Sequence, residues 1–208
     1  DLDSNPDNPN IGKIERAFSA DAAEVRRCAR IFGDAARAAG LGLCVKHFPG
    51  LGGARTDSHL ALTDLSGLIA PEQERLFTEL AGELPGCAAL FSHGFVREWD
   101  AARPASISPA AVARFRAEQP EALLITDDLQ MQGLQGAAGT VDAVVQALAA
   151  GIDLVCIGNN LLAQADECVE AARAVRERTG RDAAFSAQLA AARERIAARK
   201  RFAAGAQV

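Results

Sequence analysis

Residues 122–128 read ALLITDD: an almost wholly apolar run that meets two aspartates, Asp127 and Asp128. A strand with one face in water alternates apolar and polar residues, whereas a continuous apolar run is typical of a strand with helices on both faces. Similar runs occupy 41–48, 88–92 and 153–157. The sequence therefore predicts buried parallel strands at 41–48, 88–92, 122–126 and 153–157.

Helical patterns separate these strands, at about 19–39, 71–84, 108–118, 140–150, 162–178 and 186–203. Ser19 is a suitable helix start, Gly40 a suitable stop, and Pro71 suits a first helical turn. The alternation predicts βαβ units, hence an α/β fold with a parallel sheet. A closed barrel of this kind has eight strands. We therefore expect a partial (β/α)8 TIM-type barrel whose first strands are missing from this chain.

The start of the chain supports that expectation. It opens on Asp1, without an initiator methionine, and residues 1–12 are rich in Asn, Pro and Asp. This composition is typical of a loop leaving a strand end. We expect the missing strands, and any targeting signal, to lie upstream of Asp1.

Composition excludes several functional classes. The 208 residues carry 22 Lys plus Arg against 27 Asp plus Glu, a net charge of −5, and 49% are hydrophobic. This balance is that of a globular protein, and a mildly acidic chain is not expected to bind nucleic acid. No apolar run reaches the length of about 18 residues that a membrane span needs. The five cysteines form no C-x-x-C pair, so we expect buried free thiols, which favours the cytoplasm over an exported location.

Polar residues follow each expected strand, where parallel α/β folds place their active sites. Asp127 at such a strand end is suited to act as a nucleophile or base, or else to cap a helix. In the glycine-rich loop after 41–48, Asp57 stands two residues before His59, so it could orient the imidazole for proton transfer, or both could be ordinary surface residues. Lys46 is either a cationic donor at the mouth of the barrel, the end at which the C-terminal ends of the strands meet, or a side chain reaching solvent. No local cluster supplies enough ligands for a metal, so we predict none.

Together these residues resemble the catalytic domain of glycoside hydrolase family 3, and most of all its β-N-acetylglucosaminidase branch. The stretches that carry the resemblance are Asn5–Gly12 with Arg16-Ala17-Phe18, Lys46–Gly52, Asp57-Ser58-His59, Pro104–Ser108, Ile125–Met131, Gly151-Ile152-Asp153 and Gly158-Asn159-Asn160. They occur in the family's order. The resemblance implies that residues 1–208 form the C-terminal two-thirds of the family's catalytic barrel domain.

The resemblance also implies roles and a substrate. Asp127 would be the nucleophile and His59 the general acid/base, with Asp57 orienting it. Arg16, Lys46 and His47 would bind the sugar, without a cofactor. The reaction would be retaining hydrolysis that releases terminal β-linked N-acetylglucosamine, in peptidoglycan turnover or recycling.

Two departures and several alternatives accompany this interpretation. Leu51 stands where the family often has histidine, and Gly53 where it often has aspartate, which affects the mouth loop and substrate preference. A β-glucosidase-type member, a non-catalytic sugar-binding homologue and a metal-dependent barrel hydrolase remain open. So does a phosphorylase, because a neutral histidine does not repel phosphate as a second carboxylate would.

Overall fold

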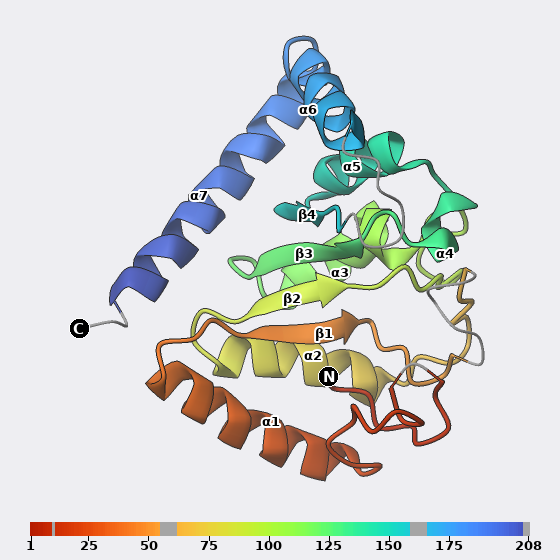
Figure 1. Cartoon of the computed structure of the whole chain (residues 1–208), viewed down its shortest axis with the longest axis vertical. Coiled ribbons are helices and arrows are strands. Elements are labelled where there is room, and N and C mark those ends of the chain that lie inside the picture. The colour runs from red at the N-terminus through yellow and green to blue at the C-terminus, as the bar shows by residue number, and fades with distance from the viewer. Residues whose placement is uncertain (10, 55–61, 159–165, 206–208) are drawn as a thin grey trace.

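The computed structural model describes residues 1–9, 11–54, 62–158 and 166–205 and contains a parallel four-stranded sheet (Figure 1). The strands are β1 (Cys44–Phe48), β2 (Ala88–Phe91), β3 (Leu123–Asp128) and β4 (Leu154–Cys156). Each strand pairs with the next one along the chain, in the order β1-β2-β3-β4. Strands added always on the same side form an arc of a (β/α) barrel, whereas a doubly wound sheet reverses direction. The predicted partial barrel and its strands are confirmed.

Helices connect the strands, as the alternation predicted. They are α1 (Ala22–Ala38), α2 (Pro71–Glu83), α3 (Pro109–Glu118), α4 (Gln132–Gln135), α5 (Thr140–Ala150), α6 (Asp166–Thr179) and α7 (Ala183–Gly205), with a 3₁₀ turn η1 (Ala105–Ile107). The short α4 and η1 were not predicted, because one turn carries no hydrophobic periodicity. None of the helices in the described part of the chain combines the length and apolar content needed to cross a bilayer.

Local residue chemistry sets the helix ends. The first helix begins later than Ser19: its N-cap is Asp21, whose carboxylate accepts hydrogen bonds from the N–H groups of Ala23 and Glu24 at 2.8 and 3.0 Å. Gly40 follows this helix at a φ of +73°, a conformation that glycine adopts without strain. Pro71 occupies the first turn of α2, as predicted.

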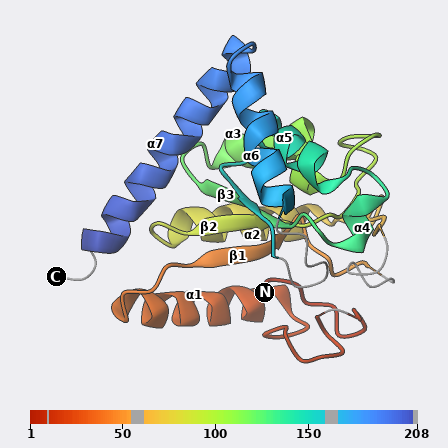
Figure 2. The ribbon, with the colours of Figure 1, turned by 45° about the horizontal axis from the view of Figure 1, so that its top comes forward.

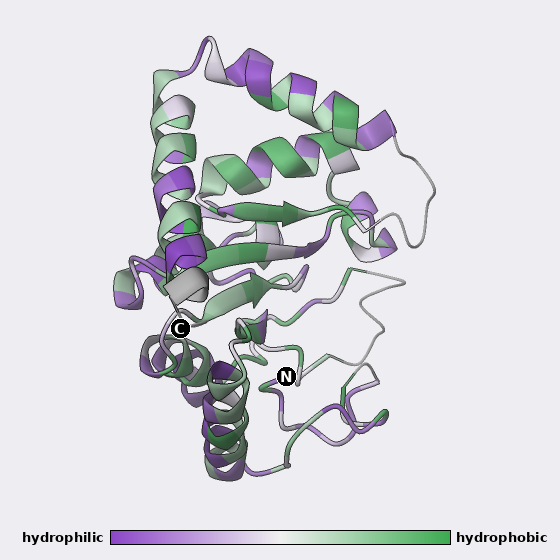
Figure 3. Ribbon diagram, turned by 60° about the vertical axis from the view of Figure 1, so that its left-hand side comes forward, coloured by the Kyte–Doolittle hydropathy of each residue, from purple (hydrophilic) through white to green (hydrophobic). Residues whose placement is uncertain are grey.

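An aromatic cluster fills the space between the sheet and its helices. The Phe48 ring lies 4.6 Å from that of Phe91 and 5.0 Å from that of Phe115, and all three side chains are fully buried. Phe48 and Phe91 are also register partners in β1 and β2. Figure 3 shows the strands mainly green, the colour of hydrophobic residues. The cluster therefore anchors β1 directly beside the polar residues at its end.

The outer strands differ from the prediction that all four are buried. Leu154 is 37% exposed, and Cys156 in β4 and Cys44 in β1 are also exposed. Among the described strands, β1 and β4 are the sheet's edges, with a neighbour on one side only. The expectation of buried thiols holds for Cys87 but is wrong for Cys44, Cys156 and Cys168. An apolar run alone does not reveal whether a strand will be central or at an edge.

Helix α7 crosses the opposite end of the sheet from the strand tips (Figures 1 and 2). Asp153, directly before β4, holds it there: its fully buried carboxylate contacts Arg195 of α7 at 2.8 Å and Arg116 at 2.7 Å. The same carboxylate accepts a hydrogen bond from the Leu124 N–H at 2.8 Å. One acidic group thus joins α3, β3, β4 and α7.

We expect Asp153→Ala to lower the free energy of unfolding by about 3–5 kcal/mol, because removing one member of a buried ion cluster leaves its partners uncompensated. Urea denaturation measures the change. The control is Asp34→Ala, which removes an ion pair with Arg37 from a carboxylate that is 68% exposed and should change stability by no more than about 1 kcal/mol. Equal losses in the two variants would contradict the role of Asp153.

Candidate active site

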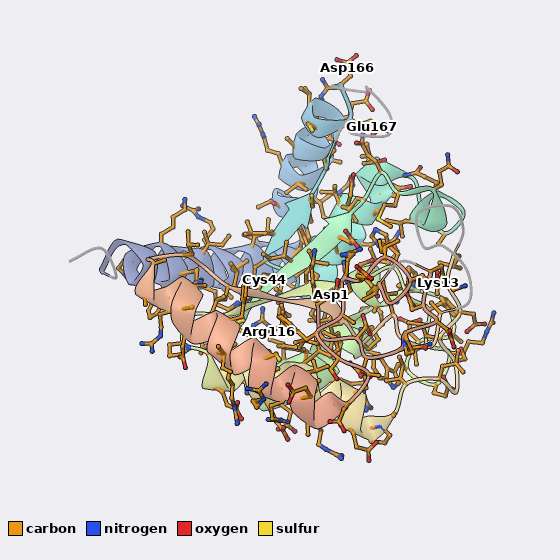
Figure 4. The ribbon with its side chains drawn as sticks, turned by 60° about the horizontal axis from the view of Figure 1, so that its bottom comes forward. Asp1, Lys13, Cys44, Arg116, Asp166 and Glu167 are labelled. Carbon is orange, nitrogen blue, oxygen red and sulfur yellow. The ribbon has the colours of Figure 1, made fainter. Side chains whose placement is uncertain are left out.

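Polar side chains converge at the C-terminal ends of the strands. His47 comes from β1, His93 follows β2, and Asp127 and Asp128 end β3. The N-terminal loop lies against this edge, with the Leu2 N–H donating to the Lys46 carbonyl at 2.9 Å. Figure 4 labels Asp1 among the side chains crowded around this loop. The loop thus adds acidic groups to the residues that the strands supply.

Asp1 brings two predicted sugar-binding residues together. Its Oδ1 lies 3.1 Å from His47 Nδ1, and its Oδ2 lies 2.9 Å from an Arg16 guanidinium nitrogen. Burial lowers the pKa of His47 to about 3, against the opposing effect of Asp127, so the imidazole is neutral at neutral pH. Since the Asp1 carboxylate accepts, Nδ1 carries the proton and Nε2 presents a lone pair.

Asp127 lies on the other side of His47. Its Oδ1 accepts a hydrogen bond from the Asp128 N–H at 2.9 Å. Its Oδ2 lies 4.0 Å from His47 Nε2, beyond hydrogen-bond distance, and the side chain is 23% exposed. One oxygen is thus held by the backbone, while the other faces the mouth of the sheet. This is an arrangement in which a carboxylate can attack an electrophilic carbon.

Asp128 has a different role from its neighbour. Its Oδ1 accepts hydrogen bonds from the Gln130 N–H at 3.0 Å and the Gly158 N–H at 2.9 Å. It therefore ties the end of β3 to the segment after β4. Neither Asp127 nor Asp128 caps the next helix, because α4 begins at Gln132 with Met131 in the cap position.

The N-terminal loop also holds the turn that follows β1. The Gly52 N–H donates to Asp3 Oδ1 at 2.9 Å, and its carbonyl accepts from the Asn5 amide. The Asn8 amide donates to the Leu51 carbonyl. The Leu51 side chain is 2% exposed and packs in a small apolar cluster that includes Ile11 and Leu65. Leucine at this position therefore serves packing beneath the mouth.

Of the other predicted site residues, the structure describes some and leaves others outside its described ranges. Arg16 reaches the site through Asp1, and Lys46 is half-buried beside His47 in β1. Asp57 and His59 lie outside the described residues, as do Asn159 and Asn160. Their roles stay predictions.

The sequence interpretation missed Asp1, Asp3 and the hydrogen bonds of His93. The signal for the two aspartates was available, because stretch 1–12 was interpreted as a loop leaving a strand end, where polar residues belong in the mouth. The partners of His93, in contrast, are far away in sequence. They are Ser106 Oγ at 2.7 Å and the Asp128 carbonyl at 2.8 Å.

Asp1, Asp3 and His47 are also the residues that could hold a cation. One ligand atom from each lies within 4.8 Å of the others, and no other such group of His, Cys, Asp or Glu occurs in the described ranges. Two of their oxygens already bind Arg16 and the Gly52 N–H. Asp1 and Asp3 thus help to position His47 and the turn after β1, while the buried Asp3 Oδ2 has no hydrogen-bond partner among the described residues.

Comparisons with known proteins identify a matching family model and several relatives. The family model described as the glycosyl hydrolase family 3 N terminal domain matches residues 1–196. The chain is 30% identical over 161 residues to a beta-hexosaminidase of Idiomarina loihiensis and 32% identical over 155 residues to one of Methylococcus capsulatus. The matches cover 70% of this chain in both cases, and 45% and 44% of the relatives. The chain thus spans less than half the length of these relatives.

Solved structures show the same likeness. A beta-N-acetylhexosaminidase from Beutenbergia cavernae superposes with a TM-score of 0.82 at 26% identity, over 96% of this chain and 60% of that one. A family 3 beta-N-acetylglucosaminidase from a Paenibacillus species gives 0.80 at 26% identity, over 100% and 39%. The arc of strands described above is thus shared with larger proteins.

Asp3 makes stability depend on pH. Burial raises its pKa to about 7, against about 3.9 in an unfolded chain. Between these values the folded protein binds a proton that the unfolded chain releases, so this contribution to stability is full below about pH 4 and is lost as pH rises to 7. We expect Asp3→Asn to gain stability over the wild type from pH 5 to pH 8, by up to about 4 kcal/mol at about 1.4 kcal/mol per pKa unit.

Urea unfolding at several pH values measures this difference. Asp7→Asn, an exposed change in the same loop, is the control. A stability difference between Asp3→Asn and wild type that stays constant from pH 5 to pH 8 would contradict the buried-carboxyl explanation.

Proposed function

The chain belongs to glycosyl hydrolase family 3, and on that premise we propose that it forms the greater part of the catalytic domain of a retaining β-N-acetylglucosaminidase. The observation that carries the proposal is the position of Asp127 and the contacts of its two carboxylate oxygens. It stands at a strand end with one oxygen bound to the backbone and the other 4.0 Å from a buried imidazole. A nucleophile needs such an oriented, partly accessible carboxylate.

In the proposed mechanism Asp127 attacks the anomeric carbon and forms a covalent glycosyl-enzyme intermediate, as retaining enzymes do. The leaving oxygen then needs a proton. His59 would supply it and afterwards deprotonate the incoming water, since an imidazole has an unperturbed pKa of about 6.5. Asp57 would stabilise the imidazolium.

Sugar hydroxyls would be bound by Arg16, Lys46 and His47. The His47 Nε2 lone pair accepts a hydrogen bond, whereas Arg16 and Lys46 offer donors. Asp1 supports this role, since it contacts His47 and Arg16 together. A ligand hydroxyl that donates to His47 Nε2 would lie close to Asp127 Oδ2, which is 4.0 Å from that nitrogen. Binding would thus bring the sugar to the nucleophile.

The proposed substrate is a terminal β-linked N-acetylglucosamine, in peptidoglycan turnover or recycling. Its support is that the bacterial relatives at 30–32% identity are named beta-hexosaminidases. The odd, unpaired set of cysteines favours a cytoplasmic location.

We expect Asp127→Ala, assayed in the full natural protein on an aryl β-N-acetylglucosaminide, to abolish turnover because no glycosyl-enzyme can form. Asp166→Ala, at the exposed start of α6 (Figure 4), is the control and should leave kcat unchanged. Full activity in Asp127→Ala would exclude this residue as nucleophile. An inactive wild type would favour a non-catalytic sugar-binding homologue.

His59→Ala tests the general acid. Its loss should slow hydrolysis of substrates with poor leaving groups by about 10²–10⁴-fold, the usual contribution of general acid–base catalysis. Substrates whose leaving groups depart without a proton should form the glycosyl-enzyme at an unchanged rate. Initial rates across a series of aryl leaving groups measure the effect, and an unchanged rate on the poorest one would exclude the assignment.

Product analysis separates hydrolysis from phosphorolysis. We expect free N-acetylglucosamine to be released at the same rate with and without inorganic phosphate, because water is the proposed acceptor. Accumulation of a sugar 1-phosphate, detected by mass spectrometry, would instead establish a phosphorylase.

A further inference from the structure

His93 is the histidine that the proposed mechanism leaves without a task. It follows β2, is 2% exposed, and has both ring nitrogens in hydrogen bonds. Nδ1 lies 2.7 Å from Ser106 Oγ, and Nε2 lies 2.8 Å from the Asp128 carbonyl oxygen. Ser106 itself is fully buried, and its N–H donates to the Ser92 carbonyl at 3.0 Å. Such a saturated, buried ring is unsuited to proton transfer with substrate or to binding a metal.

The partners decide which nitrogen carries the proton. A backbone carbonyl only accepts, so Nε2 must donate to Asp128. Burial lowers the pKa of His93, which leaves the ring neutral with an unprotonated Nδ1. The Ser106 hydroxyl therefore donates to Nδ1. The Asp128 carbonyl thus selects the tautomer, and Ser106 complements it by holding the other side of the ring.

Asp128 connects this pair to the nucleophile. Its carbonyl accepts from His93 and also from the Met131 N–H at 3.0 Å. Its N–H donates to Asp127 Oδ1 at 2.9 Å. A tilt of the residue 128 backbone would move the donor that orients the Asp127 carboxylate. The hydrogen bonds therefore run without a break from Ser106 through His93 and Asp128 to Asp127.

We propose that His93 is a positioning residue: held by Ser106 at Nδ1, it holds the Asp128 main chain through Nε2 so that Asp127 Oδ2 faces the sugar-binding residues. The inference rests on the proposed function, in which Asp127 is the nucleophile. His93 contacts neither Asp1 nor His47 by a hydrogen bond in the described part of the chain. Its loss should therefore weaken catalysis more than sugar binding.

A pair of substitutions separates the two hydrogen bonds. In His93→Gln the amide nitrogen takes the place of Nε2 and keeps the bond to Asp128, whereas in His93→Asn the amide reaches only the position of Nδ1. In the full natural protein we expect His93→Asn to lower kcat on the order of 10- to 100-fold, the scale of a misplaced catalytic group. We expect His93→Gln to stay within about threefold of wild type. The inhibition constant of the product N-acetylglucosamine should change little in both.

The kcat values of the two variants distinguish a positioning role of His93 from a general disturbance of the site. A large kcat loss in His93→Asn with a rescue in His93→Gln supports the proposal. Equal kcat values in the two variants overturn it, and so does a parallel loss of product binding, which would mark a general disturbance of the site.

Ser106 provides an independent test that does not alter the imidazole. Ser106→Ala removes the donor to Nδ1, so the ring loses one of its two hydrogen bonds and is held less firmly against the Asp128 carbonyl. We expect kcat to fall several-fold, with folding intact. Ser92→Ala removes an equally buried neighbouring hydroxyl that bonds the Gly94 N–H instead, and is the control. Equal effects on kcat would overturn the proposal.

The tautomer of His93 can be measured without an activity assay. Nitrogen-15 NMR of histidine-labelled protein, with His93 assigned from the signal lost in His93→Asn, should show a proton bonded to Nε2 and an unprotonated Nδ1. A Nδ1–H tautomer or an imidazolium would overturn the inference. An inactive wild type would refute the proposed glycosidase function alone, because the NMR result would still establish or refute the hydrogen bonds of His93.

Discussion

Parallel pairing of successive strands is the constraint on which the site depends. Each helix returns the chain to the start of the next strand, so all strands end at the same edge of the sheet (Figure 1). His47, His93 and Asp127 meet there although up to 80 residues separate them. The Phe48 aromatic cluster fixes β1 immediately beneath His47. Packing of the core therefore sets the position of the polar groups.

Burial then gives chemically similar residues different tasks. His47 and His93 are both neutral because burial lowers the pKa of each ring. His47 presents a lone pair to the mouth, whereas His93 has both nitrogens occupied by the scaffold. Asp127 and Asp128 divide in the same way, one facing the mouth and the other binding backbone N–H groups. In each pair one residue faces the mouth, and the other is bound to the scaffold.

Much of the fold could be predicted because apolar runs and helical periodicity are local properties. The strands, the longer helices and the role of Gly40 as a helix stop follow from them. The exposure of Leu154 and Cys156 could not be predicted, since it depends on β4 being an edge. Asp153 also looked like an ordinary strand-start residue, although it binds Arg116 and Arg195 from distant helices.

The sequence by itself determined the partial α/β barrel, the family resemblance and the placement of Lys46, His47 and Asp127 at strand ends. Only the tertiary structure decided that Asp1 joins Arg16 to His47, that Asp128 is a scaffold group, and that Ser106 and His93 connect to the Asp127 carboxylate. The physical reason is the distance along the sequence over which each property is set. Strand and helix patterns repeat within a few residues, whereas hydrogen-bond partners and burial, which set tautomers and pKa values, come from segments that meet only when the sheet forms.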